Sequence, residues 1–330
     1  MTNKPPYTIT EKAADYLAKI VGIITRLEYG TEFKHDIRLH RENRVQTIYS
    51  SLAIEGNSLT LGEVSAVIEG KVVAGKQADI KEVKNAYEAY DKVLTFNPYS
   101  TEDFLKAHRL MTDGLVEESG KFRSGDVGVF DGDVAVHIGA RPQFVSALIR
   151  DLFDWAKESQ LHPVLKSAIM HYEIEIIHPF ADGNGRMGRL WQTLILAKWN
   201  TIFAWIPMES VLYQNRSHYY QAIEAARIVN DSGAFIEFTL SALYDTISAQ
   251  EKHQTSLKDK HQVGIDRDAD KELIVDYIRK NSEKGVSFKA LQQVLPSHSR
   301  NQIKVFLREL QQADLIYVVG KTSAAKWFAR

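Results

Sequence analysis

The sequence predicts a mainly α-helical protein with one β-hairpin in its central part and a smaller, separate domain at its C-terminal end. Apolar residues recur at helical spacing over most of the first 254 residues. Alternating apolar residues flank the Asp131-Gly132-Asp133 turn, and the composition becomes polar and charged between Lys252 and Asp270. Because the period of the apolar pattern distinguishes helices from strands, these observations favour a helical core interrupted by one hairpin.

Nine helices are expected before the polar stretch, each from its own apolar stripe. They cover Glu11–Tyr29, Arg41–Ile54, Leu61–Glu69, Ile80–Leu94, Ser146–Lys157, Leu165–Ile177, Arg186–Trp199, Ser217–Val229 and Ala234–Gln254. We therefore divide the chain into an N-terminal helical region (1–100), a helical core (101–254), a linker (255–270) and a C-terminal domain (271–330).

The C-terminal domain shows the pattern of three helices followed by a hairpin. Apolar residues mark helices near 273–278 and 288–294, and a third helix is expected from a Ser297 cap to Leu310. A hairpin is expected between Leu315 and Phe328. This order is typical of a winged helix-turn-helix. Arg300, Lys304 and Arg308 lie at helical spacing, so contact with DNA through 297–310 is an open alternative, whereas docking of a protein or dimerisation is favoured.

Composition limits the class of protein. The chain has 330 residues, 44% of them hydrophobic, and a formal net charge of −1, which suits one sizeable core and a smaller domain. Without cysteines, disulfides and thiolate metal sites are excluded. No apolar run is long enough for a transmembrane helix, and the first residues lack the apolar region of a signal peptide. We expect a cytoplasmic protein with no membrane partner.

The most informative segment is His178-Pro-Phe-Ala-Asp-Gly-Asn-Gly-Arg-Met-Gly-Arg189. Pro179 ends the preceding helix, and Gly183-Asn184-Gly185 forms a tight turn at the start of the next. Free backbone N–H groups and the positive end of a helix dipole gather at such a turn. Because glycines let the backbone approach an anion closely, the segment predicts a phosphate site.

The side chains of this segment suit phosphate chemistry. His178 titrates near neutrality and is a candidate general base for a hydroxyl nucleophile. Asp182 is a hard oxygen ligand suited to Mg²⁺. The two arginines offer forked donors to phosphate oxygens, and Asn184 is a candidate donor to a phosphoryl oxygen as charge builds on it.

The segment resembles, at every fixed position, the Fic family motif His-x-Phe-x-(Asp/Glu)-Gly-Asn-Gly-Arg-x-x-Arg. The resemblance implies transfer of AMP from ATP to a hydroxyl of a target protein. It implies His178 as the base, Asn184 as a catalytic residue and Asp182 as the Mg²⁺ ligand. The implied nucleotide-binding residues are Gly183, Asn184, Gly185, Arg186, Met187, Gly188 and Arg189.

A second segment, Ser51-Leu-Ala-Ile-Glu55-Gly56, resembles the Fic inhibitory motif (Ser/Thr)-x-x-x-Glu-(Gly/Asn). Glu55 falls at the C-terminal end of an expected helix, where an anion is unfavourable unless it pairs with a cation elsewhere. The resemblance implies that this cation is Arg189 and that the contact blocks productive seating of the γ-phosphate of ATP.

Two further segments resemble parts of the family. Gly120-Lys-Phe122-Arg123 is similar to the stretch before a target-docking flap, here 127–139, which is expected to hold a target segment by strand addition. Arg123 is interpreted as structural and His137 as a surface residue of the flap. The stretch Tyr213–Tyr220 resembles the part that closes over adenine, with Asn215 and Tyr219 as expected contacts. A helix with one of Tyr219 and Tyr220 buried is the alternative.

The predicted function is a self-inhibited protein adenylyltransferase that modifies a Ser, Thr or Tyr hydroxyl, including its own. Removal of AMP, with Glu55 positioning a water, and a homodimer both stay open. The alternative is a nucleotide-sensing, DNA-binding transcriptional regulator whose Fic core is a ligand switch. The intact His178 favours the enzyme, because a sensor needs no general base.

Overall fold

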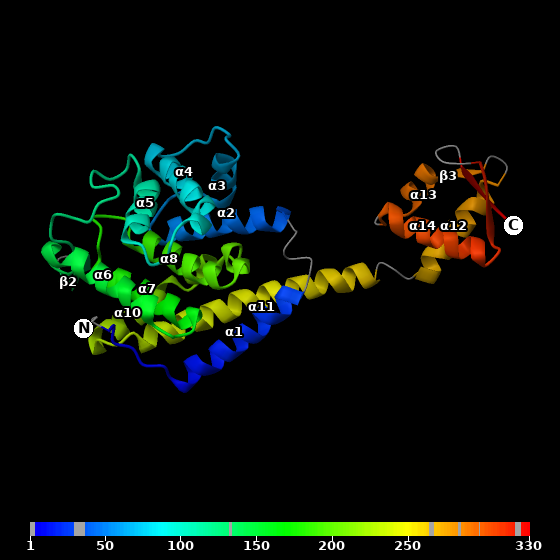
Figure 1. Cartoon of the computed structure of the whole chain (residues 1–330). Coiled ribbons are helices and arrows are strands. Elements are labelled where there is room, and N and C mark those ends of the chain that lie inside the picture. The colour runs from blue at the N-terminus through cyan, green and yellow to red at the C-terminus, as the bar shows by residue number, and fades with distance from the viewer. Residues whose placement is uncertain are drawn as a thin grey trace. The chain divides into compact units, whose positions relative to one another are not determined.

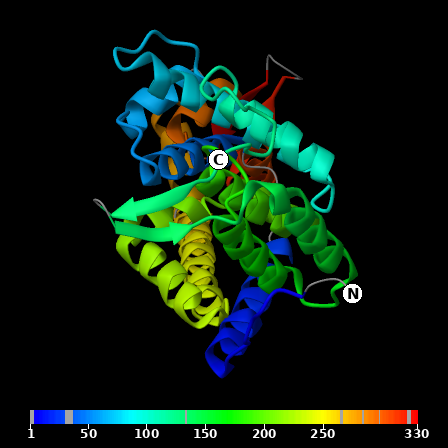
Figure 2. The same cartoon turned by 90° about the vertical axis from the view of Figure 1, so that its left-hand side faces the viewer.

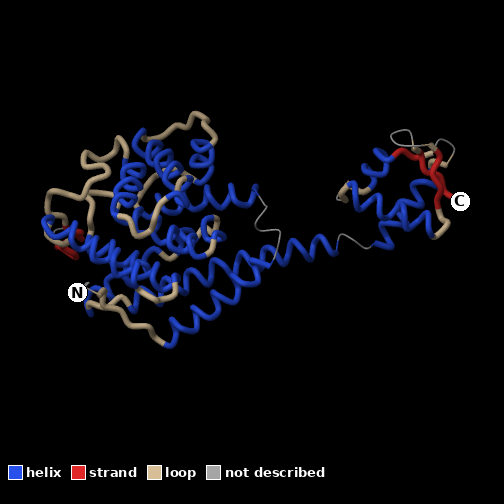
Figure 3. The backbone as a smooth tube through the Cα atoms, viewed as in Figure 1, coloured by secondary structure: helices blue, strands red, loops and turns tan. Residues whose placement is uncertain are grey.

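The computed structural model describes residues 4–29, 37–131, 134–263, 267–282, 285–296, 298–320 and 325–330. The chain divides into two compact units, Met1–Glu251 and Lys252–Arg330 (Figure 1). Helices make up most of the described residues, and the strands form one hairpin in the first unit and a small sheet in the second (Figure 3). The predicted fold class, a mainly helical protein, is confirmed.

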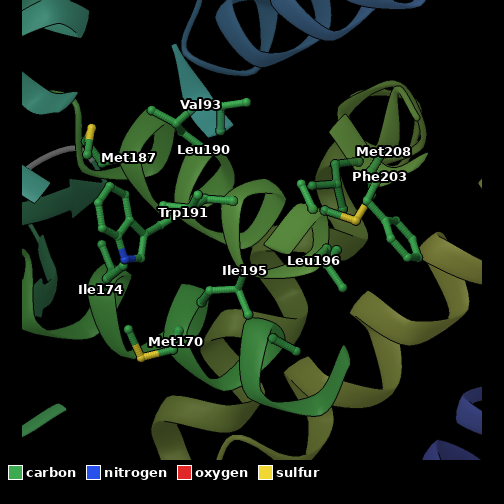
Figure 4. Packing of buried hydrophobic residues seen from close by; sticks show 14 of the residues in the cluster. Val93, Met170, Ile174, Met187, Leu190, Trp191, Ile195, Leu196, Phe203 and Met208 are labelled. Atoms are coloured by element: carbon green, nitrogen blue, oxygen red, sulfur yellow. The ribbon is translucent and has the colours of Figure 1, made fainter. Parts of the chain in front are cut away.

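The first unit is built around two helices, α7 (Pro163–Ile177) and α8 (Asn184–Trp199), which pack against each other along their length. Both are buried on nearly all sides, as expected of helices at the centre of a core. Figure 4 shows Met187, Leu190, Trp191 and Ile195 of α8 among side chains from neighbouring elements, including Met170 of α7. The turn between the two helices is therefore held from both ends by the core.

The other helices of the first unit surround this pair. Helix α2 contacts α3, α4 and α9, while α5 lies between α4 and α6 and also contacts α8. Helix α1 lies along α11, where Tyr16 contacts Tyr244. The bounds are α1 Glu11–Tyr29, α2 Ile37–Ile54, α3 Leu61–Ile68, α4 Gln77–Asp91, α5 Thr101–Thr112, α6 Pro142–Glu158, α9 Met208–Gln214, α10 Arg216–Val229 and α11 Gly233–Val263, with 3₁₀ turns η2 Val93–Thr95 and η3 Thr201–Ala204.

All nine expected helices are present, with ends displaced by a few residues, but two helices were missed. Helix α9 is only 7 residues long, too short for a repeating stripe. In α5 the buried face includes His108 and Thr112 as well as Phe104 and Met111, so polar residues interrupt the apolar pattern. None of the described helices has an apolar stretch that would cross a bilayer.

Most of the range 255–270, where a linker is expected, is helical. Helix α11 continues to Val263 and α12 begins at Arg267, while residues 264–266 lie outside the described part. The chain from Lys252 to Val263 contains neither glycine nor proline, so it propagates a helix although it lacks an apolar face. The division between the two units falls at Glu251, earlier than the expected linker.

The predicted hairpin consists of β1 (Gly128–Asp131) and β2 (Val134–Ile138), which pair antiparallel with an irregularity between Val129 and Phe130. Figure 2 shows the two strands side by side. Residues 132–133 at the tip lie outside the described residues, as does the side chain of His137.

Besides the end of α11, the described residues of the second unit form three helices and a three-stranded antiparallel sheet in the order β3-β5-β4. Its core contains Ile274, Ile278, Leu291 and Phe306. The third helix starts later than expected, because Ser299 rather than Ser297 is its cap and forms a capping box with Gln302; Ser297 itself lies outside the described residues. The bounds are α12 Arg267–Lys280, β3 Val286–Ser287, α13 Phe288–Val294, α14 Arg300–Gln312, β4 Ile316–Val319 and β5 Lys326–Ala329.

Candidate active site

The turn between α7 and α8 has an unusual backbone. His178 ends α7 in the left-handed region (φ 52°, ψ 61°), and Gly183 precedes α8 with φ 85°. A left-handed conformation costs energy for any residue except glycine, so its presence at His178 marks a position that the surrounding structure enforces. The first backbone N–H groups of the 16-residue helix α8 and the positive end of its dipole lie at this turn.

Asn184 holds the turn closed. Its Oδ1 accepts from the Phe180 N–H at 2.8 Å and its Nδ2 donates to the Phe180 carbonyl at 2.9 Å. The side chain is 3% exposed. The amide thus fixes the backbone of the turn by binding both polar groups of Phe180, and the predicted donation from Asn184 to a phosphoryl oxygen stays a prediction.

His108 on α5 packs against the turn and holds it in place. Sequence reasoning missed this residue. Its Nδ1 accepts from the Gly120 N–H at 3.0 Å, so the proton is on Nε2, which donates to the Asp182 carbonyl at 3.0 Å. Burial lowers the pKa of His108 to about 4 and keeps the ring neutral. The ring stacks on Phe180 with centroids 3.6 Å apart. A histidine inside the apolar stripe of 104–111 was the available signal.

Asp182 and Arg186 form an ion pair at the mouth of the turn. Asp182 is 61% exposed; its Oδ1 accepts from the Gly183 N–H, and its Oδ2 lies 2.9 Å from Arg186 Nη2. Arg186 Nη1 donates to Glu82 Oε1 of α4 at 3.0 Å. Both Nη atoms of this buried arginine thus bind carboxylates, while its Nε has no hydrogen-bond partner among the described residues.

Asp182 fits a metal ion that arrives with a phosphate. Among the described residues, no three acidic or histidine side chains converge on a common point. Mg²⁺ commonly binds through one or two carboxylates, several waters and substrate phosphates, rather than in an all-protein cage. A single exposed carboxylate beside an anion-binding turn matches that manner of binding.

His178 lies half-buried beside the base of the hairpin. Its Nδ1 lies 3.3 Å from the Glu175 carbonyl. Because a carbonyl only accepts, Nδ1 carries the proton and Nε2 has the lone pair that a general base needs. A Cβ on Gly139 would lie 3.2 Å from the Cβ of His178, so the end of the hairpin is in contact with this residue.

Arg123 connects the His178 segment to the hairpin, which agrees with its interpretation as structural. Its Nε donates to the His178 carbonyl at 2.6 Å and its backbone N–H to the Pro179 carbonyl at 3.0 Å. Its guanidinium also donates to the carbonyls of Gly125 and Ala140, on the two sides of the hairpin. Arg123 is 3% exposed, so it couples the position of His178 to that of the hairpin.

Arg189 and Glu55 form the contact that the sequence predicted. Arg189 Nη2 donates to Glu55 Oε1 at 2.6 Å and to the Ser51 carbonyl at 3.0 Å, and its Nε donates to Ser51 Oγ at 3.1 Å. Arg189 is fully buried, while the Glu55 side chain is 33% exposed. Burial alone would lower the pKa of Arg189, but the negative charges of Glu55 and Glu175 raise it above its usual value.

The absence of a side chain at Gly185 lets Glu55 approach α8. A Cβ on Gly185 would overlap Glu55 Oε1 and would lie 3.0 Å from Arg189 Nη1. The carboxylate of Glu55 therefore lies over the first turn of α8, where a bound anion is favoured by the helix dipole. Gly56, with φ 92°, ends helix α2 directly after Glu55 and so fixes where the carboxylate lies.

A buried carboxylate, Glu175, lies on the other side of Arg189. Its Oε1 would be 3.2 Å from a Cβ on Gly185 and accepts from Tyr219 OH at 3.2 Å. Burial opposes its charge, but the hydrogen bond from His171 and the nearby cations lower the pKa of Glu175 overall. Within the part of the chain that the structure describes, Arg189 Nη1 has no hydrogen-bond partner. Sequence reasoning missed Glu175, whose role depends on the distant Tyr219.

Tyr219 does not face a nucleotide, which corrects the prediction for this residue. It is 1% exposed, and its hydroxyl contacts Glu175 and His171. Tyr220, by contrast, is 47% exposed. The alternative, a helix with one of the two rings buried, is therefore the one observed.

An open cleft of about 690 Å³ lies beside these residues, in the size range of small-molecule sites. It is lined by Ile54, Tyr213, Gln214, Arg216, Ser217 and Tyr220. Asn215 is not among the lining residues, and its Nδ2 donates to the Val211 carbonyl at 3.0 Å. These lining residues come from the end of α2, from α9 and from α10, and sequence reasoning, which named Asn215 and Tyr219, missed them.

Met187 and Gly188 have packing roles rather than the predicted nucleotide contacts. Met187 is fully buried, and its backbone N–H donates to the Gly183 carbonyl at 2.9 Å. A Cβ on Gly188 would lie 2.5 Å from the His171 ring, so glycine is needed for the close approach of α7 and α8. Of the predicted residues, the turn brings together His178, Asp182, Gly183, Gly185, Arg186 and Arg189.

Comparisons with known proteins agree with this geometry. The model of the Fic/DOC family matches residues 98–196, which include the turn. A crystal structure of a Fic family protein from Desulfovibrio desulfuricans is 37% identical, covers 99% of this chain and 98% of its own, and superposes with a TM-score of 0.73.

Two curated proteins are also similar. Protein adenylyltransferase fic-1 of Caenorhabditis briggsae is 30% identical over 252 residues, which are 72% of this chain and 46% of that protein. Protein adenylyltransferase Fic of Nematostella vectensis is 32% identical over 223 residues, which are 64% of this chain and 50% of that protein. The chain thus spans half or less of the length of these relatives.

Proposed function

The chain belongs to the Fic family, and from this we propose that it is a protein adenylyltransferase held inactive by its own Glu55. One observation carries the proposal: the carboxylate of Glu55 lies over the first turn of α8 and binds Arg189, as an anionic ligand of that site would. The proposed donor is ATP, and the proposed acceptor is a Ser, Thr or Tyr hydroxyl of a protein, including the chain itself.

The proposed reaction uses the turn as its phosphate site. The hydroxyl oxygen of the target attacks the α-phosphorus of ATP, the bond from that phosphorus to the bridging oxygen breaks, and pyrophosphate leaves. The proton of the hydroxyl passes to His178 Nε2. The N-terminal N–H groups of α8 stabilise the charge that develops on the α-phosphoryl oxygens. Mg²⁺ that enters with ATP would be held by Asp182 and would neutralise phosphate charge.

The cleft beside Ile54 is the proposed position of the nucleotide. An adenine against Tyr220 and Tyr213 would place its phosphates toward Glu55 and the start of α8, because Ile54 directly precedes Glu55. Aromatic rings and the Gln214 amide suit a purine. In this arrangement the γ-phosphate and Glu55 require the same cation, Arg189.

The proposed inhibition is a competition between two anions. Arg189 is buried and offers Nη2 to Glu55, so a γ-phosphate must displace that carboxylate or stay away from Arg189. Partly buried, hydrogen-bonded ion pairs resist such exchange more than exposed ones do. Displacement would need movement at the C-terminal end of α2. The same carboxylate is placed to orient a water, and we extend the proposal to removal of AMP.

The hairpin is the proposed docking site of the target. A two-stranded sheet has free edges that accept a further strand. Gly139 at its end contacts His178, and Arg123 bonds to both the hairpin ends and the His178 carbonyl. A segment added to this edge would bring its hydroxyl to the base.

Intact-mass measurement of the full chain with Mg-ATP tests the function. Glu55→Gly should gain one or more AMP groups, and Glu55→Gly with His178→Ala should gain none. Glu117→Gly, at an exposed position of the first unit, serves as a control that removes a carboxylate without touching Arg189. An unmodified Glu55→Gly chain, together with no transfer to any added protein, would reject the proposal.

A further inference from the structure

We propose that the second unit binds double-stranded DNA through the exposed face of helix α14. This helix packs one side into the core of its unit with Ile303, Phe306, Leu307 and Leu310. Its other side is exposed and carries Asn301, Lys304, Arg308 and Gln311. These are the side-chain types that donate to phosphates and to base edges in DNA.

The charge of this part of the chain favours a polyanion. Residues 285–330 contain seven Lys and Arg but only two Asp and Glu. Both acidic residues form ion pairs: Glu309 lies 2.8 Å from Lys271, and Asp314 lies 2.8 Å from Arg330. The other acidic residues of the unit belong to α12, to its flanks or, in the case of Asp259, to the end of α11. The exposed face of α14 is therefore free of carboxylates, which would repel a phosphate backbone.

The cations of this face are available for a partner. Over the described residues, neither Lys304 nor Arg308 makes an ion pair or a hydrogen bond within the chain, and Asn301 makes no side-chain hydrogen bond. Arg300 lies over the Phe288 ring at 5.4 Å. Duplex DNA carries one negative charge per about 1.7 Å of its axis, so unpaired cations along one helix face complement it.

The arrangement of the helices places this face outward. Helices α13 and α14 are consecutive and joined by the short segment 295–299, as in a helix-turn-helix. The capping box of Ser299 and Gln302 fixes the start of α14, so Asn301 lies in its first turn. A recognition helix contacts base edges with its N-terminal residues, and asparagine reads adenine with both its amide groups. The 13 residues of α14 form a helix roughly 20 Å long, and the major groove of DNA, about 12 Å wide, admits an α-helix.

The composition of this face favours DNA over a protein partner. Protein interfaces are enriched in aromatic residues and depleted in lysine at their centres. Of the exposed large apolar side chains of the unit, Tyr317, Val318 and Val319 lie on strand β4, Leu315 directly precedes it, Leu273 lies on α12, and α14 contributes only Val305. Lys304, Arg308 and Asn301 on α14 instead match the chemistry of a nucleic acid.

Fluorescence anisotropy of the full chain with a labelled pool of random-sequence DNA duplexes tests the proposal, over salt concentrations of about 50 to 200 mM. The wild type should bind, with affinity that falls steeply as salt rises. Lys304→Ala with Arg308→Ala should weaken binding and reduce the slope of log affinity against log salt by about 0.9 for each phosphate that is no longer neutralised. Arg279→Ala with Lys280→Ala, on α12, removes the same charge and should bind as the wild type does.

The variant Asn301→Ala tests recognition of bases separately from charge, because it removes an amide and no charged group. It should leave the salt dependence unchanged but flatten the sequence preference found by selection from the random pool. The thermal unfolding midpoint of each variant must match the wild type. Absence of binding at low salt, or equal weakening by the α12 control, would overturn the proposal. So would loss of self-association in the α14 variant without any effect on DNA.

Discussion

Arg189 Nη2 lies 2.6 Å from Glu55 Oε1; Arg189 belongs to helix α8, Glu55 directly follows helix α2, and the two residues are 134 positions apart in the chain. The contact joins a fully buried cation to a partly exposed carboxylate. The buried cation is fixed by Ser51 as well, through two hydrogen bonds. Of the two partners, Glu55 is therefore the one that moves when the contact opens.

Removal of Glu55 should destabilise the chain in the absence of nucleotide. Glu55→Ala leaves the buried Arg189 without its closest counter-charge, although Glu175 compensates in part, so we expect the free energy of unfolding to fall by about 1–3 kcal/mol. Mg-ATP should then raise the unfolding midpoint of the variant more than that of the wild type, because a phosphate pairs with Arg189 again. Thermal unfolding with and without Mg-ATP measures both the loss of stability and the stabilisation by the nucleotide. Equal shifts in the two proteins would contradict the account.

Replacement of His178 should abolish transfer and spare nucleotide binding. In a Glu55→Gly background, His178→Ala removes the proposed base, which typically costs about 10²–10⁴-fold in rate. Its side chain contributes little to holding phosphates, so the dissociation constant of Mg-ATP should stay within a few-fold. Single-turnover AMP incorporation gives the rate of transfer, and calorimetric titration gives the dissociation constant of Mg-ATP. An unchanged rate would remove His178 from the mechanism.

The stability of the first unit should depend on pH through His108. Its folded pKa of about 4 is below the ordinary value of 6.5, so the unfolded state binds the proton first. Stability is fully present above pH 6.5 and is lost as the pH falls toward 4, by at most about 3 kcal/mol. His108→Gln should flatten this loss.

Glu173 makes the opposite contribution and must be separated from it. Burial raises the pKa of Glu173 to about 7, so its contribution is present below pH 4.5 and is lost as the pH rises toward 7. Denaturant unfolding across pH 4–7, for His108→Gln and Glu173→Gln beside the wild type, distinguishes the two slopes. An unaltered acid slope in His108→Gln would show that another group is responsible.

Two adjacent tyrosines should respond differently to substitution. Tyr220→Ala removes an exposed ring that lines the cleft and should weaken Mg-ATP binding by about 1–2 kcal/mol if adenine packs there, or roughly 5–30-fold. Tyr219→Phe keeps the buried ring and removes only the hydroxyl that bonds Glu175, so it should change nucleotide affinity little. Titration calorimetry in the Glu55→Gly background is the measurement. The reverse ranking would place the nucleotide elsewhere.

Features that depend on neighbouring residues of the chain could be predicted from the sequence, whereas contacts between distant residues could not. The spacing of Pro179 and Gly183 predicts the turn, because these residues constrain their own backbone. The pairing of Glu55 with Arg189 required the family resemblance, since nothing local links them. Which of Tyr219 and Tyr220 points inward depends on the rotation of α10 against α7, and no property of the pair decides it. His108 and Glu175 were missed because their partners are distant in the chain.

The helix at the start of the second unit illustrates a different limit. Because Lys252–Val263 lacks an apolar face, a linker is expected there. This expectation assumes that a helix forms only where an apolar face packs against a core. Here helix-forming residues without glycine or proline suffice.

The central claim is that Glu55 inhibits through Arg189, and the rate of AMP incorporation in a double-mutant cycle tests it most directly. Wild type, Glu55→Gly, Arg189→Ala and the double variant are compared under Mg-ATP. With Arg189 present, Glu55→Gly should raise the rate at least about tenfold, since a charge-assisted contact is worth about 1.5–3 kcal/mol. With Arg189→Ala, the same change should have almost no effect. An equal increase in both backgrounds would contradict the claim.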